Sequence, residues 1–311
     1  MESNKSPFLA IHPEVMGAIQ ERRPVVALES TLIAHGLPYP ENLKTATLLE
    51  EAVRKNGAIP ATIAIIKGKL KIGLSKSEVE FLAQSGDITK CNKREIPVLI
   101  STKKSGATTV SATMFLSSLS GIQFFATGGI GGVHIGGASS FDISSDLQEL
   151  AQTNVAVVSA GAKSILDIGL TLEYLETQGV PVLGYRSEHF PSFYRRESGF
   201  KVNHSFDDID ELVKTIQIKW NLGLQGGVLI CNPIPKAFEL KFESNQTAIE
   251  SALKEAETMK IGGKALTPFL VERIHQITGG ASVTSNIELV RNNAILAAKM
   301  AAIYADIEGR I

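Results

Sequence analysis

The chain has few cysteines, no excess of charge of either sign and no long hydrophobic run, and each absence excludes a class of protein. Cys91 and Cys231 are its two cysteines and stand far apart. They match neither a disulfide framework nor a paired zinc motif, which is typical of a reducing compartment. The formal net charge is -1, whereas a nucleic-acid-binding domain presents a basic face. We therefore expect a small-molecule substrate and no nucleic-acid partner.

No segment of the sequence is apolar enough to predict a membrane span, which requires about 20 consecutive, mostly apolar residues. Residues 105–141 contain no Asp, Glu, Lys or Arg, but SGATTVSAT, SSLSG and TGGIGGVHIGG interrupt this uncharged segment. The N-terminus lacks the basic and then apolar order of a secretory signal. These features predict a cytoplasmic protein that does not bind a membrane.

Short apolar segments alternate with helical patterns, which is typical of an α/β domain with a largely parallel, buried sheet. PVVALEST, TNVAVVSAG and GGVLICNP have the composition of strands, and residues 41–57 have the pattern of a helix that ends at Gly57. From about residue 245 the chain is rich in helical patterns. Because no linker or internal repeat divides the sequence, we predict a single domain over residues 1–311.

Charged residues return after the uncharged segment as Asp142 and Asp146, followed by Lys163. This order, a glycine-rich segment followed by two acids and a lysine, favours a site in which a lysine amine reacts with an anionic substrate. TGGIGGVHIGG does not match the dinucleotide motif GxGxxG, because His134 stands at the position of the third glycine. Its glycines allow backbone amides to approach a phosphate, or form simple tight turns.

Lys163 follows the strand pattern VAVVS and precedes Ser164 and Asp167, which have the spacing of a helix capping box. This spacing predicts that Lys163 lies beside a helix N-terminus. The positive end of the helix and desolvation would both lower the pKa of the amine. A neutral amine attacks a carbonyl or anomeric carbon. The alternative is a solvated lysine in a loop.

Three acidic residues are further candidates. Glu29 lies in an otherwise apolar strand, so burial is expected to raise its pKa and to make it a proton donor near neutral pH. The alternative for Glu29 is a structural role. Asp142 and Asp146 flank Ser144 and Ser145 in the pattern of a helix start, where carboxylates stabilise the first turn. Alternatively, one of these acids holds Mg²⁺ or Mn²⁺ together with several waters.

Seven motifs show a resemblance to one family. ALEST, KCNKREIP, GATTVSATM, FATGGIGGVH, FDISSDLQEL, VVSAGAKSILDIGLTLEYLETQGVPVLGY and TGGASVTSNIELVRNNA occur in this order over nearly the whole chain. The chain resembles pseudouridine-5′-phosphate glycosidases. The resemblance implies a three-layer α/β/α sandwich with a largely parallel sheet, usually assembled as a homotrimer. It also implies reversible cleavage of pseudouridine 5′-phosphate to uracil and ribose 5-phosphate, with Mn²⁺ or another divalent cation such as Mg²⁺.

The resemblance also assigns roles to individual residues. It implies that Glu29 is the proton donor, Lys163 the covalent nucleophile and Asp142 the metal ligand. It implies substrate contacts from Lys90, Val110 (through its backbone), His134, Ser144, Ser145, Asp146 and, on the uracil side, Asn286. KCNKREIP departs from the usual KVSRRDLP, so the phosphate contacts near Cys91 and Asn92 stay open.

Pseudouridine joins ribose to uracil through carbon, so protonation of a leaving nitrogen is not available. Two carboxylates that flank the bond would not suffice, whereas attack by Lys163 on the opening ribose leads to an imine that water hydrolyses. Two alternatives stay open: another imine-forming sugar-phosphate lyase or aldolase, and a non-catalytic sugar-phosphate-binding protein. The resemblance further implies a pseudouridine kinase that supplies the substrate.

Overall fold

The computed structural model describes residues 6–261 and 266–309. In this part of the chain, eleven strands form one central sheet. The main path through the sheet is β1 (Leu9–Ile11), β4 (Lys69–Ile72), β3 (Ile59–Ile66), β2 (Val25–Glu29), β7 (Phe124–Ala126), β9 (Ala156–Ser159), β13 (Val228–Cys231), β11 (Val182–Tyr185) and β12 (His204–Phe206). A branch of β6 (Gly106–Thr108) and β5 (Thr89–Cys91) pairs with β3.

The sheet is largely parallel, as the sequence predicts. The central strands β2, β7, β9 and β13 run parallel to their neighbours, and the antiparallel pairs are those that β3 forms with β4 and β6. The strand β3 reads IPATIAII and is buried over almost its whole length. Such a continuous apolar run indicates a strand that is covered on both faces.

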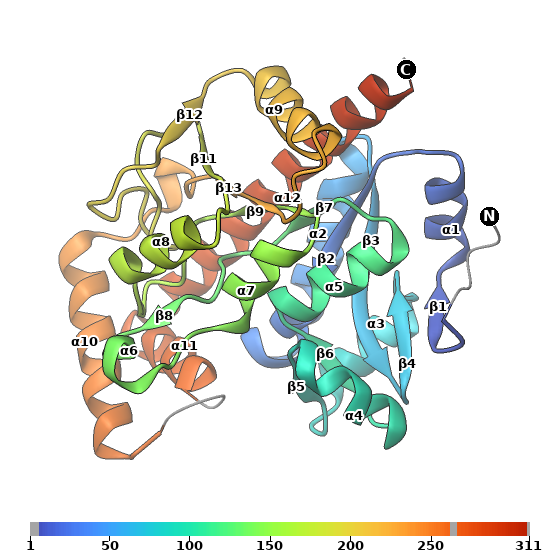
Figure 1. Ribbon diagram of the computed structural model, residues 1–311. Helices are drawn as coiled ribbons and strands as arrows, with labels where there is room; N and C mark the ends of the chain where they lie inside the picture. The colour runs from blue at the N-terminus through green and yellow to red at the C-terminus, as the bar shows by residue number, and fades with distance from the viewer. Residues whose placement is uncertain (1–5, 262–265, 310–311) are drawn as a thin grey trace.

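Helices cover both faces of the sheet, so the fold is the expected three-layer α/β/α sandwich (Figure 1). On one face, α12 (Ala281–Glu308) packs on β2, β7 and β9 and against α2 (Glu41–Lys55). On the other face, α5 (Val110–Ser120) packs on β2 and β3 and against α7 (Ser145–Gln152). The other helices are α1 (Pro13–Gln20), α3 (Lys76–Gln84), α4 (Ile96–Ser101), α6 (Gly137–Ser140), α8 (Ile168–Thr177), α9 (Ile209–Asn221), α10 (Phe242–Thr258) and α11 (Leu266–Ile277).

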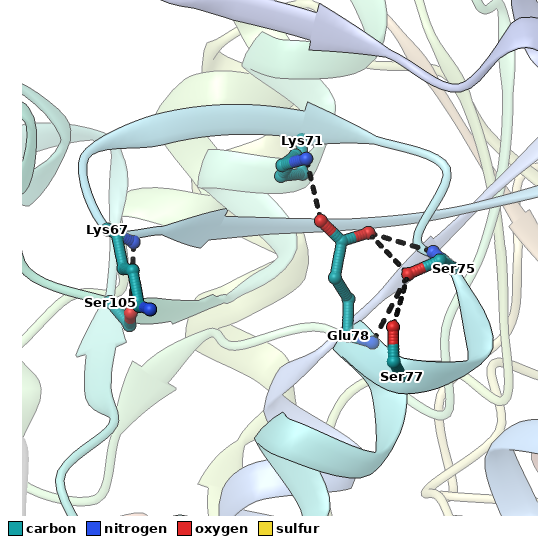
Figure 2. A network of polar contacts seen from close by, with 6 residues as sticks. All are labelled: Lys67, Lys71, Ser75, Ser77, Glu78 and Ser105. Atoms are coloured by element: carbon teal, nitrogen blue, oxygen red, sulfur yellow. Dashed lines mark hydrogen bonds and ion pairs between the residues drawn. The ribbon is translucent and has the colours of Figure 1, made fainter.

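The start of α3 shows how local sequence sets an element boundary. The Ser75 hydroxyl accepts a hydrogen bond from the Glu78 backbone N–H, and the Glu78 carboxylate accepts one from the Ser75 N–H at 2.9 Å (Figure 2). The Lys71 ammonium lies 2.6 Å from the same carboxylate. Because Lys71 belongs to β4, this capping box also ties α3 to the sheet.

The predicted capping box at Ser164 is wrong. Leu166 and Asp167 form the short strand β10, which pairs antiparallel with β8 (Val133–His134). This pairing shifts the helix start, so Asp167 is itself the N-cap of α8 and accepts from the Leu170 N–H at 2.9 Å. Lys163 therefore precedes a strand and does not adjoin a helix N-terminus.

The helix start predicted around Asp146 is confirmed. Ser144 is the N-cap of α7, its hydroxyl accepts from the Asp146 N–H at 3.2 Å, and Asp146 lies in the first turn. Asp142 lies outside the helix, in the irregular segment that precedes it. Across the described residues, no helix has both the length and the apolar character needed to cross a bilayer.

Candidate active site

The candidate site lies where three neighbouring parallel strands end. Glu29 is the last residue of β2, Thr127 follows β7, and Lys163 follows β9 after a short turn. In open α/β sheets, ligands bind in the crevice outside the carboxyl ends of the strands. The strand order therefore brings together residues that are far apart in the sequence.

Two adjoining chambers occupy this crevice. The large chamber has a volume of about 610 Å³ and the small chamber a volume of about 90 Å³. Both chambers are lined by Glu29, Thr31, Lys90 and Lys163. The large chamber is also lined by the predicted residues His134, Asp142, Ser144, Ser145 and Asp146. The small chamber is more apolar, with Leu28, Leu32, Ala126, Phe193 and Val290 in its wall.

Two predicted residues lie outside the large chamber. Asn286 projects from α12 into the wall of the small chamber, where its side-chain oxygen is buried and has no hydrogen-bond partner among the described residues. Val110 is the first residue of α5, and its side chain is only 1% exposed. Val110 lines neither chamber, so its predicted backbone contact with substrate stays a prediction.

Glu29 is held by a buried polar network that starts at α12. The Thr127 hydroxyl donates a hydrogen bond to the Glu29 carboxylate. The Thr127 carbonyl accepts from Asn293 at 2.8 Å, and the Asn293 side-chain oxygen accepts from Asn232 at 3.0 Å. Burial raises the pKa of Glu29, although the nearby Lys163 ammonium and the Thr127 hydrogen bond act in the opposite direction. The predicted direction of the pKa shift is confirmed.

The backbone around Lys163 is fixed by hydrogen bonds and by one glycine. The Lys163 N–H donates to the Ile130 carbonyl at 3.1 Å, and the Ile130 N–H donates to the Gly161 carbonyl at 3.0 Å. Gly161 has φ +75°, and a Cβ atom there would lie 1.9 Å from the Pro191 carbonyl oxygen. Only glycine fits this position, which indicates that the turn carrying Lys163 is tightly specified.

Asp146 connects the glycine-rich loop to α5. Its carboxylate is buried and accepts from the Ser111 N–H at 2.9 Å and from the Gly131 N–H at 2.8 Å. At Gly131 a Cβ atom would lie 2.2 Å from the Ser144 hydroxyl oxygen. These contacts give Asp146 a positioning role in the chamber wall, and its contact with substrate stays a prediction.

His134 and Asp142 lie together at the wall of the large chamber. The His134 backbone N–H donates to the Asp142 carbonyl at 3.0 Å. Burial lowers the pKa of His134, Lys163 and Lys90 lower it further, and the Asp142 carboxylate opposes them. Among the described residues, no three His, Cys, Asp or Glu side chains are grouped as metal ligands. The Asp142 carboxylate supplies one oxygen donor of the kind that a hard divalent cation prefers, and its role as a metal ligand stays a prediction.

Cys91 and Asn92, where the motif KCNKREIP departs from the family pattern, lie in different surroundings. Cys91 is fully buried in the core, whereas Asn92 lines the large chamber. Arg94, from the 3₁₀ turn η2 (Lys93–Glu95), lines it too, and its side chain also pairs with Glu95 at 2.8 Å. Asn92 and Arg94 are therefore polar groups of the chamber wall near Lys90, and the sequence leaves their contact with phosphate open.

Sequence reasoning also missed Thr31, Thr127 and His35. All three line the small chamber. Thr31 and His35 follow Glu29 within six positions. Their closeness in sequence to an acid at a strand end could have indicated that they line the site. Thr127 follows the strand pattern GIQFFA in the same way.

Comparison with known proteins assigns the chain to a family. A family model described as indigoidine synthase A like protein matches residues 14–303. A pseudouridine-5′-phosphate glycosidase of Caldanaerobacter subterraneus is 58% identical over 294 residues, which cover 94% of this chain and 96% of the relative. Another, of Brachyspira hyodysenteriae, is 52% identical and covers 98% of this chain and 99% of the relative. The chain belongs to the pseudouridine-5′-phosphate glycosidase family.

Two solved structures extend this family relationship to the fold. The prealnumycin C-glycosynthase AlnA, solved in complex with ribulose 5-phosphate, superposes with a TM-score of 0.91 at 38% identity and covers 98% of this chain and 100% of its own. An indigoidine synthase A-like protein of Thermotoga maritima gives a TM-score of 0.86 at 35% identity and covers 95% of this chain and 96% of its own. The glycosidase family therefore shares this three-layer fold with a C-glycosynthase.

Proposed function

We propose that the protein reversibly cleaves the C–C glycosidic bond of pseudouridine 5′-phosphate to give uracil and ribose 5-phosphate. One observation carries this proposal: Glu29 and Lys163 line both chambers, so they lie at the boundary between a large polar space and a small, more apolar one. A phosphorylated pentose suits the large chamber and a pyrimidine base suits the small one. The bond between them then lies beside the amine and the acid.

In the proposed reaction, the Lys163 amine attacks C1′ of the ribose. The C1′–N bond forms as the C1′–O4′ bond breaks, and O4′ takes a proton. Next, C5 of the base takes a proton, and the electron pair of the C1′–C5 bond stays with the base. The nitrogen lone pair completes a C=N bond to C1′. Water then hydrolyses the imine, which restores Lys163 and releases ribose 5-phosphate.

Glu29 is the proposed proton carrier for these steps. Its raised pKa keeps a larger fraction of the carboxyl protonated near neutral pH than an exposed glutamate would have. Its other neighbour, Lys163, is the group whose proton must leave before attack. A single carboxyl next to the amine can therefore accept a proton at one step and donate it at the next.

We propose that Lys90, Ser144 and Ser145 bind the pentose phosphate, with His134 in the chamber wall. An ammonium and two hydroxyls are suitable donors for phosphate oxygens. Val110, the first residue of α5, is the proposed backbone contact, whereas the next N–H, that of Ser111, is already bonded to Asp146. On the other side of Lys163, Asn286 is the proposed contact for uracil, because its buried oxygen lacks a partner.

We further propose that Asp142 holds a divalent cation, Mn²⁺ or Mg²⁺, whose charge would neutralise the phosphorylated substrate. Calorimetric titration with Mn²⁺ measures this without turnover. Asp142→Asn should weaken Mn²⁺ binding by about tenfold or more, whereas Asp167→Asn, a change at a helix N-cap, should not. Equal Mn²⁺ affinity of Asp142→Asn and the unaltered protein would contradict the assignment.

The direct test of the proposed function is to incubate the protein with pseudouridine 5′-phosphate and Mn²⁺ and to measure free uracil. Release of uracil together with ribose 5-phosphate supports it. If no uracil is released but an imine with another sugar phosphate can be trapped, the protein is instead another imine-forming lyase or aldolase. Binding without product at high enzyme concentration would indicate a sugar-phosphate-binding protein.

We also propose a homotrimer, which sedimentation analysis of the full chain tests.

A further inference from the structure

The small chamber contains two buried polar atoms with no protein partner. Among the described residues, three buried side-chain atoms lack a hydrogen bond: His35 Nε2, His189 Nδ1 and Asn286 Oδ1. His35 and Asn286 both line the small chamber. An unpaired buried polar atom destabilises a fold unless a ligand or water satisfies it. Two such atoms in the lining of one chamber therefore point to a ligand with two complementary groups.

His35 is held in place by an unusual turn. It lies in the π-helix η1 (Leu32–Gly36), which begins three residues after Glu29. The buried Asn42 side chain fixes this turn, because its amide donates to the Ile33 carbonyl at 2.8 Å and to the Ala83 carbonyl at 2.9 Å. Single π-helical turns occur frequently at functional sites. The ring of His35 therefore has a defined position in the chamber wall.

The electrostatic surroundings make His35 a hydrogen-bond acceptor. Burial lowers the pKa of His35, and the nearby Lys90 ammonium lowers it further. A hydrogen bond from the ring to the Ile88 backbone raises the pKa and so acts in the opposite direction, and the nitrogen without a partner is Nε2. A neutral imidazole has one donor and one acceptor nitrogen. With the proton on the nitrogen that bonds to the Ile88 backbone, the unpaired Nε2 is left as an acceptor in a side chain that lines the small chamber.

We propose that His35 is a specificity-determining residue that accepts a hydrogen bond from N1–H of the C-linked base. This inference rests on the proposed function. A base attached through C5 carries two ring N–H groups, at N1 and N3, whereas an N1-linked uracil carries one. The Asn286 carboxamide presents an acceptor and a donor side by side, which matches N3–H and an adjacent carbonyl. The single acceptor of His35 matches N1–H, whose other neighbour is the apolar C6–H.

The same contact would assist the reaction. Protonation at C5 leaves positive charge that N1 shares, and an acceptor at N1–H stabilises that charge as it develops. The π-helical turn thus places a base-reading group in the same small chamber as the proton donor Glu29. This accounts for an unpaired histidine nitrogen in a wall that is otherwise mostly apolar.

The test compares pseudouridine 5′-phosphate with its N1-methyl derivative as substrates. Methylation removes the donor, so we expect kcat/KM of the unaltered protein to fall roughly 10- to 100-fold. In His35→Ala the two substrates should be cleaved with similar kcat/KM, because the acceptor is gone and space for the methyl group is created. His35→Gln retains an acceptor and should restore part of the discrimination. His189→Ala removes the other unpaired histidine and should leave the discrimination unchanged.

The outcomes separate this inference from the proposed function. If the unaltered protein releases no uracil from pseudouridine 5′-phosphate, the proposed function is wrong. If it releases uracil but His35→Ala keeps the full discrimination against the N1-methyl substrate, the assignment of His35 alone is overturned. If His35→Ala is inactive, calorimetry can instead compare the affinity of each protein for uracil with its affinity for 1-methyluracil. The unaltered protein should prefer uracil, and His35→Ala should bind both similarly. A retained preference for uracil would again overturn the assignment.

Discussion

The Thr127 hydroxyl donates a hydrogen bond to the Glu29 carboxylate, and so joins the ends of the neighbouring strands β7 and β2. This bond favours the charged form of Glu29 and opposes the effect of burial on its pKa. Burial on one side, and the Lys163 ammonium and this hydrogen bond on the other, together set the pH range in which Glu29 is available as an acid.

Thr127→Val tests this balance. The substitution removes a hydrogen bond that lowers the pKa of Glu29, so that pKa should rise further above its ordinary value. The protonated form would then persist to higher pH, and the alkaline limb of the pH profile of kcat/KM should shift to higher pH. Thr153→Val is the matched control, because Thr153 also donates to a carboxylate, that of Glu149. A limb that stays in place or moves to lower pH in Thr127→Val would contradict this role for Glu29.

Gly161→Ala tests whether the turn before Lys163 is tightly specified. The new Cβ would collide with the Pro191 carbonyl oxygen, and a left-handed backbone is unfavourable for alanine. We expect a loss of more than about 2 kcal/mol in the free energy of unfolding. The control is Gly179→Ala, where φ is +68° but no atom lies within 4 Å, so a loss of only about 1 kcal/mol is expected. Equal losses in urea denaturation would show that the contact with Pro191 is unimportant.

Asp146→Asn tests the positioning role of Asp146. Both carboxylate oxygens accept from backbone N–H groups, and an amide would direct its NH₂ group toward one of these donors. The free energy of unfolding should fall by about 1–3 kcal/mol. Asp167→Asn is a suitable control, because asparagine and aspartate cap a helix equally well. If Asp146→Asn unfolds at the same urea concentration as the unaltered protein, Asp146 does not hold the glycine-rich loop.

The parts of the site that the sequence predicts are those set by local patterns. Glu29 and Lys163 each follow an apolar strand pattern, and the carboxyl ends of parallel strands meet at one edge of a sheet. The serine at the start of α3 and the apolar run of β3 are local signals of the same kind. These signals specify the elements and the edge of the sheet where chemistry occurs.

The parts that sequence reasoning missed depend on contacts between distant segments. Asn293 binds the Thr127 carbonyl across 166 positions of sequence, and no local pattern indicates such a pair. The capping box at Ser164 was wrong because the next residues pair with β8 instead of entering a helix. His35 was missed because neither its π-helical turn nor its unpaired nitrogen is visible before the chain is folded.

The central claim is that the Lys163 side chain becomes covalently bonded to the opened pentose. The most direct measurement is borohydride reduction during turnover of pseudouridine 5′-phosphate, followed by mass spectrometry of the peptide that contains Lys163. The account predicts a pentose-phosphate adduct on Lys163, and neither adduct nor uracil release in Lys163→Ala. An unmodified Lys163 peptide, recovered while uracil is being released, would contradict it.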